Sequence, residues 1–239
     1  SETVQTSVLV DKALPAVVSP TVSPNPAKLG DTVSAVFSFS KQIDETTLEI
    51  DWDGLGFERV ESGSSNVFTY TLKITETISE KGYTFSGSVS DEVGNGPVEF
   101  DIGELSVDVT PPSLLNEKVE VTDGKEAIKI GDKVTVTFEV SESLEGTPEV
   151  TIDGKRFERE GDSDTPFSYH YTVADSDIEG IKTILVSMSD LARNQNVVEL
   201  GDTVRFDLSA PEVINPTVTP AGNPGMAGTG TKIEVRFNI

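Results

Sequence analysis

The chain has 239 residues, of which 41 are Asp or Glu and 18 are Lys or Arg, so its formal net charge is −23. This charge repels phosphate backbones and anionic lipid, so we expect no nucleic-acid partner. No apolar run approaches the roughly 20 residues needed to span a bilayer, so we expect no membrane insertion. Cysteine is absent from the sequence, which excludes disulfides, thiol nucleophiles and Cys-ligated zinc.

A repeat with a period of about 100 residues organises the sequence. Its first marker is a glycine followed seven residues later by a strand phenylalanine, and it occurs at Gly30, Gly131 and Gly230. Its second marker is an aspartate four residues before a proline, at Asp11, Asp108 and Asp207. Two further markers are an Asp-x-x-x-Asn turn and a Phe-Glu-Arg triplet, found at 91–95 and 190–194 and at 57–59 and 157–159. Four markers in one order at one period indicate a tandem array.

The markers divide the chain into four segments. We assign residues 1–14 to the last strand of a preceding repeat and residues 210–239 to the first strands of a following one. Residues 15–110 and 111–209 are whole repeats. The sequence therefore predicts a piece of a longer array.

Within the repeats, apolar residues alternate with polar ones. In chain order, the alternating segments are 32–39, 48–53, 68–72, 83–89, 133–138 and 184–188. A period of two predicts strands rather than helices. Asp53-Gly54, Gly94-Asn95 and Asp153-Gly154 supply turns between them. We predict an all-β fold of tandem immunoglobulin-like Greek-key β-sandwiches, with about seven strands per repeat.

The end of the first repeat resembles a known family. Residues 91–95 (Asp-Glu-Val-Gly-Asn), followed by 107–112 (Val-Asp-Val-Thr-Pro-Pro), are similar to the close of a bacterial immunoglobulin-like (Big-type) repeat. Such repeats end in an aspartate–glycine–asparagine turn, a last strand and an Asp-Thr-x-Pro-like linker. The second repeat departs from this pattern, with Arg193 in place of glycine and Ser-Ala-Pro at 209–211. The resemblance implies an extracellular rod or spacer, as in surface-layer proteins and large adhesins.

Calcium is the ligand that the sequence supports best, because it takes six to eight oxygen ligands from carboxylates, carbonyls and amides. We expect the Asp-x-x-x-Asn turn and the linker after the last strand to lie at the same end of each sandwich. The candidate metal ligands are Asp91, Asn95 and Asp108 at one junction and Asp190, Asn194 and Asp207 at the next. Asp31 and Asp132 could each add a ligand. The alternative is that these residues only form turns.

Two single residues have a functional and a structural interpretation. Trp52, the only tryptophan, could stack on a sugar, but it shares a strand face with Leu48 and Ile50, which favours a core position. His170, the only histidine, has no serine or cysteine partner motif, which favours an outward strand residue. We assign no catalytic or cofactor-binding residue and expect no enzymatic activity.

The sequence therefore favours a non-catalytic structural repeat region of a cell-surface protein, either a surface-layer or filament subunit or an adhesin stalk. Its expected partners are the neighbouring repeats of the same chain and further copies in an array, joined laterally by exposed strand edges. The alternative function is a glycan- or protein-binding accessory module of a secreted multidomain protein. Exposed aromatic side chains on one loop cluster would favour that alternative.

Overall fold

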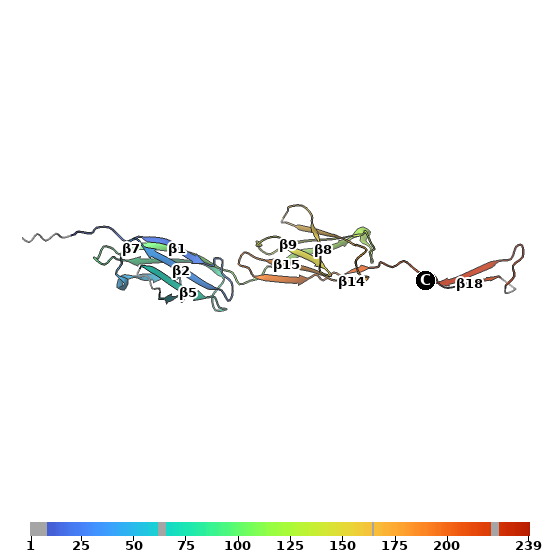
Figure 1. Cartoon of the computed structure of the whole chain (residues 1–239), viewed down its shortest axis with the longest axis horizontal. Helices are drawn as coiled ribbons and strands as arrows, with labels where there is room; N and C mark the ends of the chain where they lie inside the picture. The colour runs from blue at the N-terminus through green and yellow to red at the C-terminus, as the bar shows by residue number, and fades with distance from the viewer. Residues whose placement is uncertain (1–8, 62–65, 164, 221–224) are drawn as a thin grey trace, which may run out of the picture. The chain divides into compact units, whose positions relative to one another are not determined.

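A computed structural model describes residues 9–61, 66–163, 165–220 and 225–239 (Figure 1). Its contacts divide the chain into two compact units. The first comprises residues 1–115, 140–149 and 186–198, and the second comprises 116–139, 150–185 and 199–239. In the described part of the chain, no helix is long and apolar enough to cross a membrane.

The first repeat is built from seven strands and one short 3₁₀ helix. They are β1 (Val17–Ser23), β2 (Thr32–Phe39), η1 (Glu45–Thr47), β3 (Glu49–Asp51), β4 (Glu58–Val60), β5 (Val67–Lys73), β6 (Lys81–Val89) and β7 (Val98–Val107). One antiparallel sheet has the order β1-β2-β5-β4 and the other has the order β3-β6-β7. This is the strand order of an immunoglobulin constant-type sandwich, so the predicted fold class is confirmed.

The core of this sandwich lies between the two sheets, as the alternation predicts. Val33, Ala35 and Phe37 of β2 are at most 1% exposed, whereas the residues between them are partly exposed. The Phe37 ring stacks on Phe68 of β5 with ring centroids 5.7 Å apart. Tyr83, at the start of β6, donates its hydroxyl to the carbonyl of a residue four positions upstream, at 2.8 Å. Immunoglobulin sandwiches share this tyrosine corner.

The second repeat follows the same plan with more interrupted strands. Its elements are β8 (Leu114–Val121), η2 (Thr122–Gly124), β9 (Lys133–Val140), β10 (Glu149–Ile152), β11 (Lys155–Arg156), β12 (Glu158–Arg159), β13 (Phe167–Thr172), β14 (Gly180–Lys182), β15 (Ile184–Ser189), β16 (Gln195–Glu199) and β17 (Val204–Phe206). The sheet β12-β13-β9-β8 corresponds to β4-β5-β2-β1 of the first repeat. The other strands form β11-β10-β15-β16 and the pair β14-β17.

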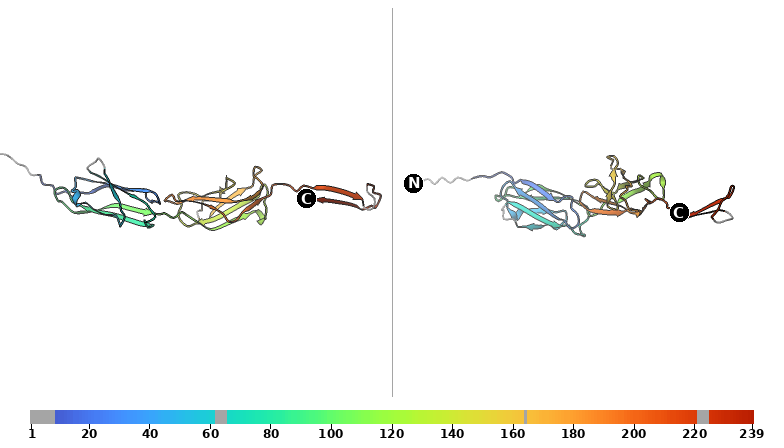
Figure 2. Two further views of the ribbon diagram at one scale, coloured as in Figure 1. Left: turned by 90° about the horizontal axis from the view of Figure 1, so that it is seen from below. Right: turned by 45° about the vertical axis from the view of Figure 1, so that its right-hand side comes forward.

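Residues 214–238 form a third copy of the first hairpin of each repeat (Figure 2). Strand β18 (Ile214–Pro220) pairs with β19 (Ile233–Asn238), and an irregularity between Ile214 and Thr217 matches the one between Val18 and Thr21 in β1. Two backbone features recur in all three copies. Positive φ angles of 47°, 54° and 51° occur at Ser19, Asn116 and Asn215, and angles of 85°, 87° and 88° occur at Gly30, Gly131 and Gly230.

The predicted repeat boundaries remain a prediction. Residues 9–14 carry no assigned strand, and residues 1–8 lie outside the described part of the chain.

Candidate inter-repeat joint

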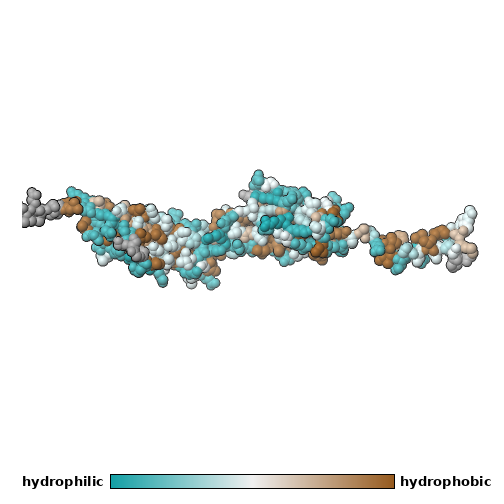
Figure 3. Space-filling model, in the orientation of Figure 1, coloured by the Kyte–Doolittle hydropathy of each residue, from teal (hydrophilic) through white to brown (hydrophobic). Residues whose placement is uncertain are grey.

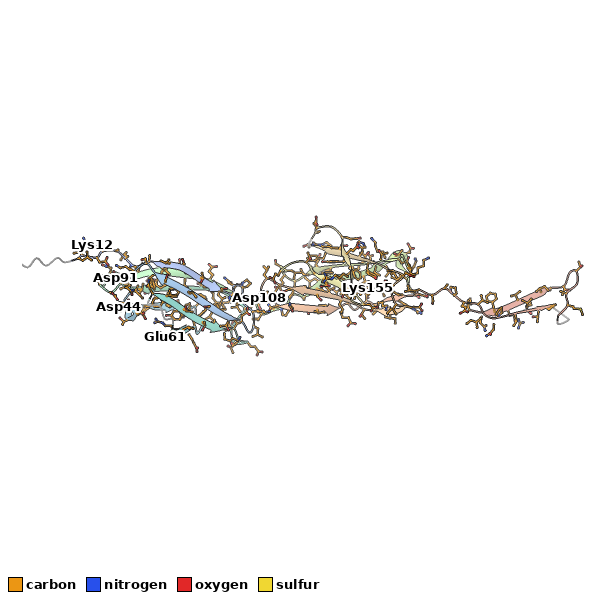
Figure 4. All side chains as sticks on the ribbon, in the orientation of Figure 1. Lys12, Asp44, Glu61, Asp91, Asp108 and Lys155 are labelled. Atoms are coloured by element: carbon orange, nitrogen blue, oxygen red, sulfur yellow. The ribbon has the colours of Figure 1, made fainter. Side chains whose placement is uncertain are left out.

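We expected the Asp-x-x-x-Asn turn of each repeat to lie beside the linker that follows the last strand of the same repeat. This expectation is wrong. Asp91 and Asn95 lie before β7, and Asp108 lies directly after it (Figure 4). The ten residues of β7 span about 33 Å at 3.3 Å per residue, so the two sites lie at opposite ends of the sandwich. Because one strand separates each turn from the next linker, a turn can meet only the linker that precedes its own repeat.

In the first repeat, the turn binds that preceding segment. Asp91 is 1% exposed and accepts hydrogen bonds from the Asn95 amide nitrogen at 2.7 Å and from Asn95 Nδ2 at 2.7 Å. Asn95 Nδ2 also lies 3.4 Å from the Asp11 carbonyl oxygen. Lys41 Nζ donates to Asp91 Oδ2 at 2.6 Å and also to the Asp11 carboxylate. Burial alone would raise the pKa of Asp91, but the bonds from Lys41 and Asn95 hold this pKa well below its usual range.

The second turn repeats this geometry with Asp108 instead of Asp11. Asp190 is fully buried and accepts from the backbone nitrogen and Nδ2 of Asn194, both at 2.8 Å. Asn194 Nδ2 donates to the Asp108 carbonyl oxygen at 3.0 Å. These residues all belong to the first compact unit. The expected partner, Asp207, follows β17 and donates its amide to Ile128, so its grouping with Asp190 is also wrong.

Three carboxylates meet at this second turn. One oxygen from each of Asp108, Glu142 and Asp190 lies within 4.8 Å of the other two. Desolvation raises the pKa of Asp108, and the nearby carboxylates of Asp190 and Glu80 raise it further. Desolvation also raises the pKa of Glu142, with Asp108 and Asp190 adding to the effect. The cluster therefore concentrates negative charge in a partly buried place.

Sequence reasoning missed Glu142, although the repeat contains the signal. Glu142 stands four residues after Phe138 of β9, just as Lys41 stands four residues after Phe37 of β2 in the first repeat. The surroundings of the two turns therefore differ in the sign of the charge on one side chain. In the first repeat the ammonium of Lys41 lies between Asp11 and Asp91, and in the second repeat Glu142 puts a carboxylate beside Asp108 and Asp190.

Arg193 takes the place in the second turn that Gly94 has in the first. Its φ of 69° lies in the left-handed region that Gly94 occupies in the first turn at 88°. Arg193 Nη2 donates to Asp31 Oδ2 at 3.2 Å, and Lys28 Nζ donates to the Arg193 carbonyl oxygen at 2.7 Å. Lys28 and Asp31 of the Lys-x-Gly-Asp motif in the first repeat thus both bind Arg193 in the turn of the second repeat. Asp31, an expected ligand, is an ion-pair partner here.

Asp132, the other expected additional ligand, has a partner within its own repeat. Its carboxylate oxygens lie 3.2 Å from Lys125 Nζ, and one of them accepts from the Lys129 amide at 3.0 Å. The Lys129 bond is the largest cause that lowers the pKa of Asp132, and Lys125 adds to it.

A glutamate fixes the linker at the end of each repeat, and sequence reasoning did not find it. Glu80 Oε2 accepts from the Val109 amide at 3.2 Å and from the Thr110 hydroxyl at 2.8 Å. Glu179 Oε2 accepts from the amides of Leu208 and Ser209 at 3.2 and 3.0 Å. The bonds from Ser209 and Leu208 lower the pKa of Glu179.

Trp52 and His170 occupy the positions that the alternation favours. Trp52 packs against the first core, with its ring centroid 4.3 Å from Phe57 and 5.3 Å from Phe85. His170 lies on β13 between buried Tyr169 and half-buried Tyr171 and faces the opposite side from Tyr169.

Comparisons with known proteins give structural likenesses alone. No family model and no curated protein matches the chain. Similar solved structures include the N-terminal eight Ig domains of Down syndrome cell adhesion molecule isoform 1.30.30, with 18% identity and a TM-score of 0.41 over 82% of this chain and 25% of that chain. The D00-D0 domain of intimin has 12% identity and a TM-score of 0.36, over 80% of this chain and 100% of that chain. A chimeric titin Z1Z2-Z1Z2 tandem has 14% identity and a TM-score of 0.28, with the same two coverages. The present chain thus spans only a quarter of the first of these chains, and the immunoglobulin-like assignment rests on the strand order.

Proposed function

We propose that this chain is a non-catalytic structural repeat region of a cell-surface protein, in which calcium fastens the joint at Asp108, Glu142 and Asp190. The protein would work outside the cell as a Big-type surface-layer or filament subunit, or as an adhesin stalk. Its mechanism is mechanical. Each sandwich buries its own core, and the joints between repeats limit bending.

The proposal rests on one difference between the repeats: the second has Glu142 at the position where the first has Lys41. Lys41 supplies a positive charge to the buried carboxylate of the first turn at 2.6 Å. At the second turn, three carboxylate oxygens lie within 4.8 Å of one another, and no ion pair among the described residues joins Asp108, Glu142 or Asp190 to a lysine or arginine. Carboxylates this close repel one another, and this repulsion adds to desolvation in raising the pKa values of Asp108 and Glu142. A bound divalent cation would remove it.

The donor set fits calcium. Asp190 receives the same two bonds from Asn194 that Asp91 receives from Asn95. Asp91 Oδ2 accepts the Lys41 ammonium in addition to its asparagine bond, so the equivalent oxygen of Asp190 has the capacity to bind a cation. Asp108 and Glu142 add two more carboxylates, the oxygen ligands that calcium prefers. When bound, calcium supplies neutralising charge and a cross-link between these residues.

Thermal unfolding with calcium and with excess EDTA tests the proposal. A ligand that binds only the folded state stabilises it, by about 2.7 kcal/mol at one hundred times its dissociation constant. At that concentration, calcium should therefore raise the melting temperature of the wild-type chain by about 5–11 °C. The variant Glu142→Lys installs the ammonium of the first turn, so it should melt higher in EDTA than the wild type and lose its response to calcium.

The matched control is Glu145→Lys, which makes the same charge change at an exposed position of the same loop. It should keep the full calcium response. If EDTA leaves the melting temperature of the wild type unchanged and both variants behave alike, calcium does not bind here and the aspartates only form turns.

The glycan-binding alternative has less support. Its sequence feature is Trp52, and the indole packs against Phe57 and Phe85 beside the first core. A side chain that is needed in this packing offers little free face for a sugar.

A further inference from the structure

Arginine occupies a backbone position in the second turn that favours glycine. The φ angle of Arg193 is 69°, and the equivalent Gly94 of the first turn has a φ of 88°. A side chain strains the backbone in this left-handed region, whereas glycine adopts it freely. Arginine at this position therefore lowers the stability of the turn unless its guanidinium makes a compensating contact.

The guanidinium of Arg193 contacts the first repeat through an ion pair. Its Nη2 atom lies 3.2 Å from Asp31 Oδ2, and the two side chains are 47% and 21% exposed. The Asp31 carboxylate is held in place by its own turn, because the same oxygen accepts from the Lys28 amide at 3.2 Å. Lys28 Nζ donates to the Arg193 carbonyl oxygen at 2.7 Å, so a second cation lies beside the arginine. All three residues belong to the first compact unit.

This ion pair adds little to stability. Water screens the two charges of an exposed pair, and both side chains lose conformational freedom when they meet. The gain from such a pair is no larger than the cost of the strained backbone at Arg193. Complementary charge between two partners gives specificity more than affinity. These magnitudes agree with a role of Arg193 in selecting a partner.

The second repeat supplies a cation to its equivalent aspartate from within. Asp132 accepts from the Lys129 amide at 3.0 Å, as Asp31 accepts from the Lys28 amide. Both carboxylate oxygens of Asp132 also lie 3.2 Å from Lys125 Nζ, which belongs to the same repeat. The charge of this aspartate is therefore balanced without a neighbour.

A longer loop accompanies this internal lysine. The two recurring positive-φ positions of each hairpin are 11 residues apart in the first repeat and 15 residues apart in the second. The longer segment contains η2 and, directly after it, Lys125. The two repeats thus differ in the source of the cation, which is a loop of the same repeat for Asp132 and the turn of the next repeat for Asp31.

We infer that Arg193 and Asp31 select the neighbour at this joint. A turn that carries arginine fits a repeat whose Lys-x-Gly-Asp aspartate has no lysine of its own. Against an aspartate that a lysine already neutralises, the same guanidinium meets a second cation and is rejected. Hydrophilic residues cover much of the visible surface of both repeats (Figure 3), so charge is available there to distinguish one neighbour from another. Because tandem repeats misassemble by pairing with the wrong copy, such selection favours the correct joint.

A double-mutant cycle in the full chain tests the selection. Because the chain has no cysteine, spin labels on Val60→Cys and Val197→Cys, exposed positions of the first and second repeats, report the ratio of docked to undocked joints. Asp31→Asn removes the charge of the aspartate and keeps an oxygen for the Lys28 amide. It should lower the docked ratio about two- to fivefold beside Arg193 and leave it unchanged beside Arg193→Gln.

Charge reversal gives a sharper result, because selection by charge predicts a change of sign. Arg193→Glu should lower the docked ratio in the wild-type background, where it faces Asp31. The same substitution should raise the ratio in the Asp31→Lys background, where the new carboxylate faces an ammonium. An incidental ion pair predicts the same ratio in every variant, and a packing role of Arg193 predicts a loss in both backgrounds. Either of these results overturns the inference.

Two further variants complete the test. Asp132→Asn is the matched control, because it removes the equivalent carboxylate, whose cation is Lys125 of the same repeat. It should leave the docked ratio unchanged. Arg193→Gly should lower the docked ratio but melt no lower than the wild type, because it relieves the strained backbone. A melting temperature that falls together with the docked ratio would show that Arg193 only stabilises the joint, which also overturns the inference.

These measurements are made in EDTA, so they do not depend on calcium. The ion pair of Arg193 and Asp31 involves none of the three carboxylates of the proposed calcium site. On the calcium proposal, added calcium should raise the docked ratio of the wild type and of Asp31→Asn by the same factor. A failure of the calcium proposal therefore leaves the result of the cycle intact, and the reverse also holds.

Discussion

Asp177 marks a place where the two repeats fill equivalent positions with different side chains, polar ones in the second repeat and apolar ones in the first. Its carboxylate is 4% exposed and accepts from the Tyr171 hydroxyl at 2.7 Å and from the Ala174 amide at 2.7 Å, and it pairs with Lys155. Burial alone would raise the pKa of Asp177, but the bonds from Lys155, Ala174 and Tyr171 lower it. The equivalent positions of the first repeat hold three apolar residues, Leu55, Leu72 and Ile78.

We expect Asp177→Ala to lower the free energy of unfolding by about 2–3 kcal/mol, because it leaves Tyr171 and Lys155 without their acceptor. The triple variant Lys155→Leu, Tyr171→Leu, Asp177→Ile installs the residues of the first repeat. It should be as stable as the wild type or more so, because well-packed apolar residues often replace a buried ion pair without loss. Urea unfolding measures the free energy of unfolding of both variants. A triple variant less stable than Asp177→Ala would contradict the assignment.

The same contacts give a pH dependence with a defined sign. The pKa of Asp177 is lower in the folded chain than the ordinary value of 3.8, so its contribution to stability is complete above that value. The contribution is lost as the pH falls through the folded pKa.

At the scale of elements, the linkers are held from within their own repeats. Glu80 and Glu179 stand 99 residues apart and accept from the backbone directly after β7 and β17. Each carboxylate therefore sets the direction in which the chain leaves its sandwich.

Amide hydrogen exchange tests this role. Replacing Glu179 by Ala removes the acceptor for two amides, and a charged hydrogen bond contributes about 1.5–3 kcal/mol. Exchange at Leu208 and Ser209 should therefore become at least about tenfold faster, while Glu199→Ala, at an exposed position on β16, should have no effect there. Equal exchange in the two variants would show that the linker is held by other contacts.

The elements themselves could be predicted from the sequence, because alternation with a period of two marks each buried strand face. Val33, Ala35 and Phe37 show this directly. The site could be predicted only in part. Asp108 and Asp190 are in the cluster, and each turn aspartate pairs with its asparagine as expected. The linker aspartate assigned to each turn was wrong, because the prediction did not count the strand that separates a turn from its following linker. Glu142 was missed because no local motif surrounds it.

At the scale of the whole molecule, the net charge of −23 opposes compact packing through self-repulsion. Sodium chloride screens that repulsion, since the Debye length falls from about 30 Å at 0.01 M to about 3 Å at 1 M. In EDTA, the melting temperature should therefore rise by a few degrees over this range.

On our proposal, calcium at equal ionic strength should stabilise the chain more than sodium chloride does, because it would bind the cluster of Asp108, Glu142 and Asp190 in addition to screening. Glu142→Lys should abolish this difference and retain the response to sodium chloride. A calcium effect that matches sodium chloride at every ionic strength would indicate screening alone.

The exchange between Lys41 and Glu142 has a consequence for an array under load. On our proposal, a joint that carries its own lysine does not depend on calcium, whereas a joint with glutamate in that place yields when calcium is scarce. One side chain per repeat then decides where a stretched array is stiff and where it is compliant. On the same proposal, the order of lysine and glutamate along the array would set its elasticity, and the surrounding calcium concentration would adjust it.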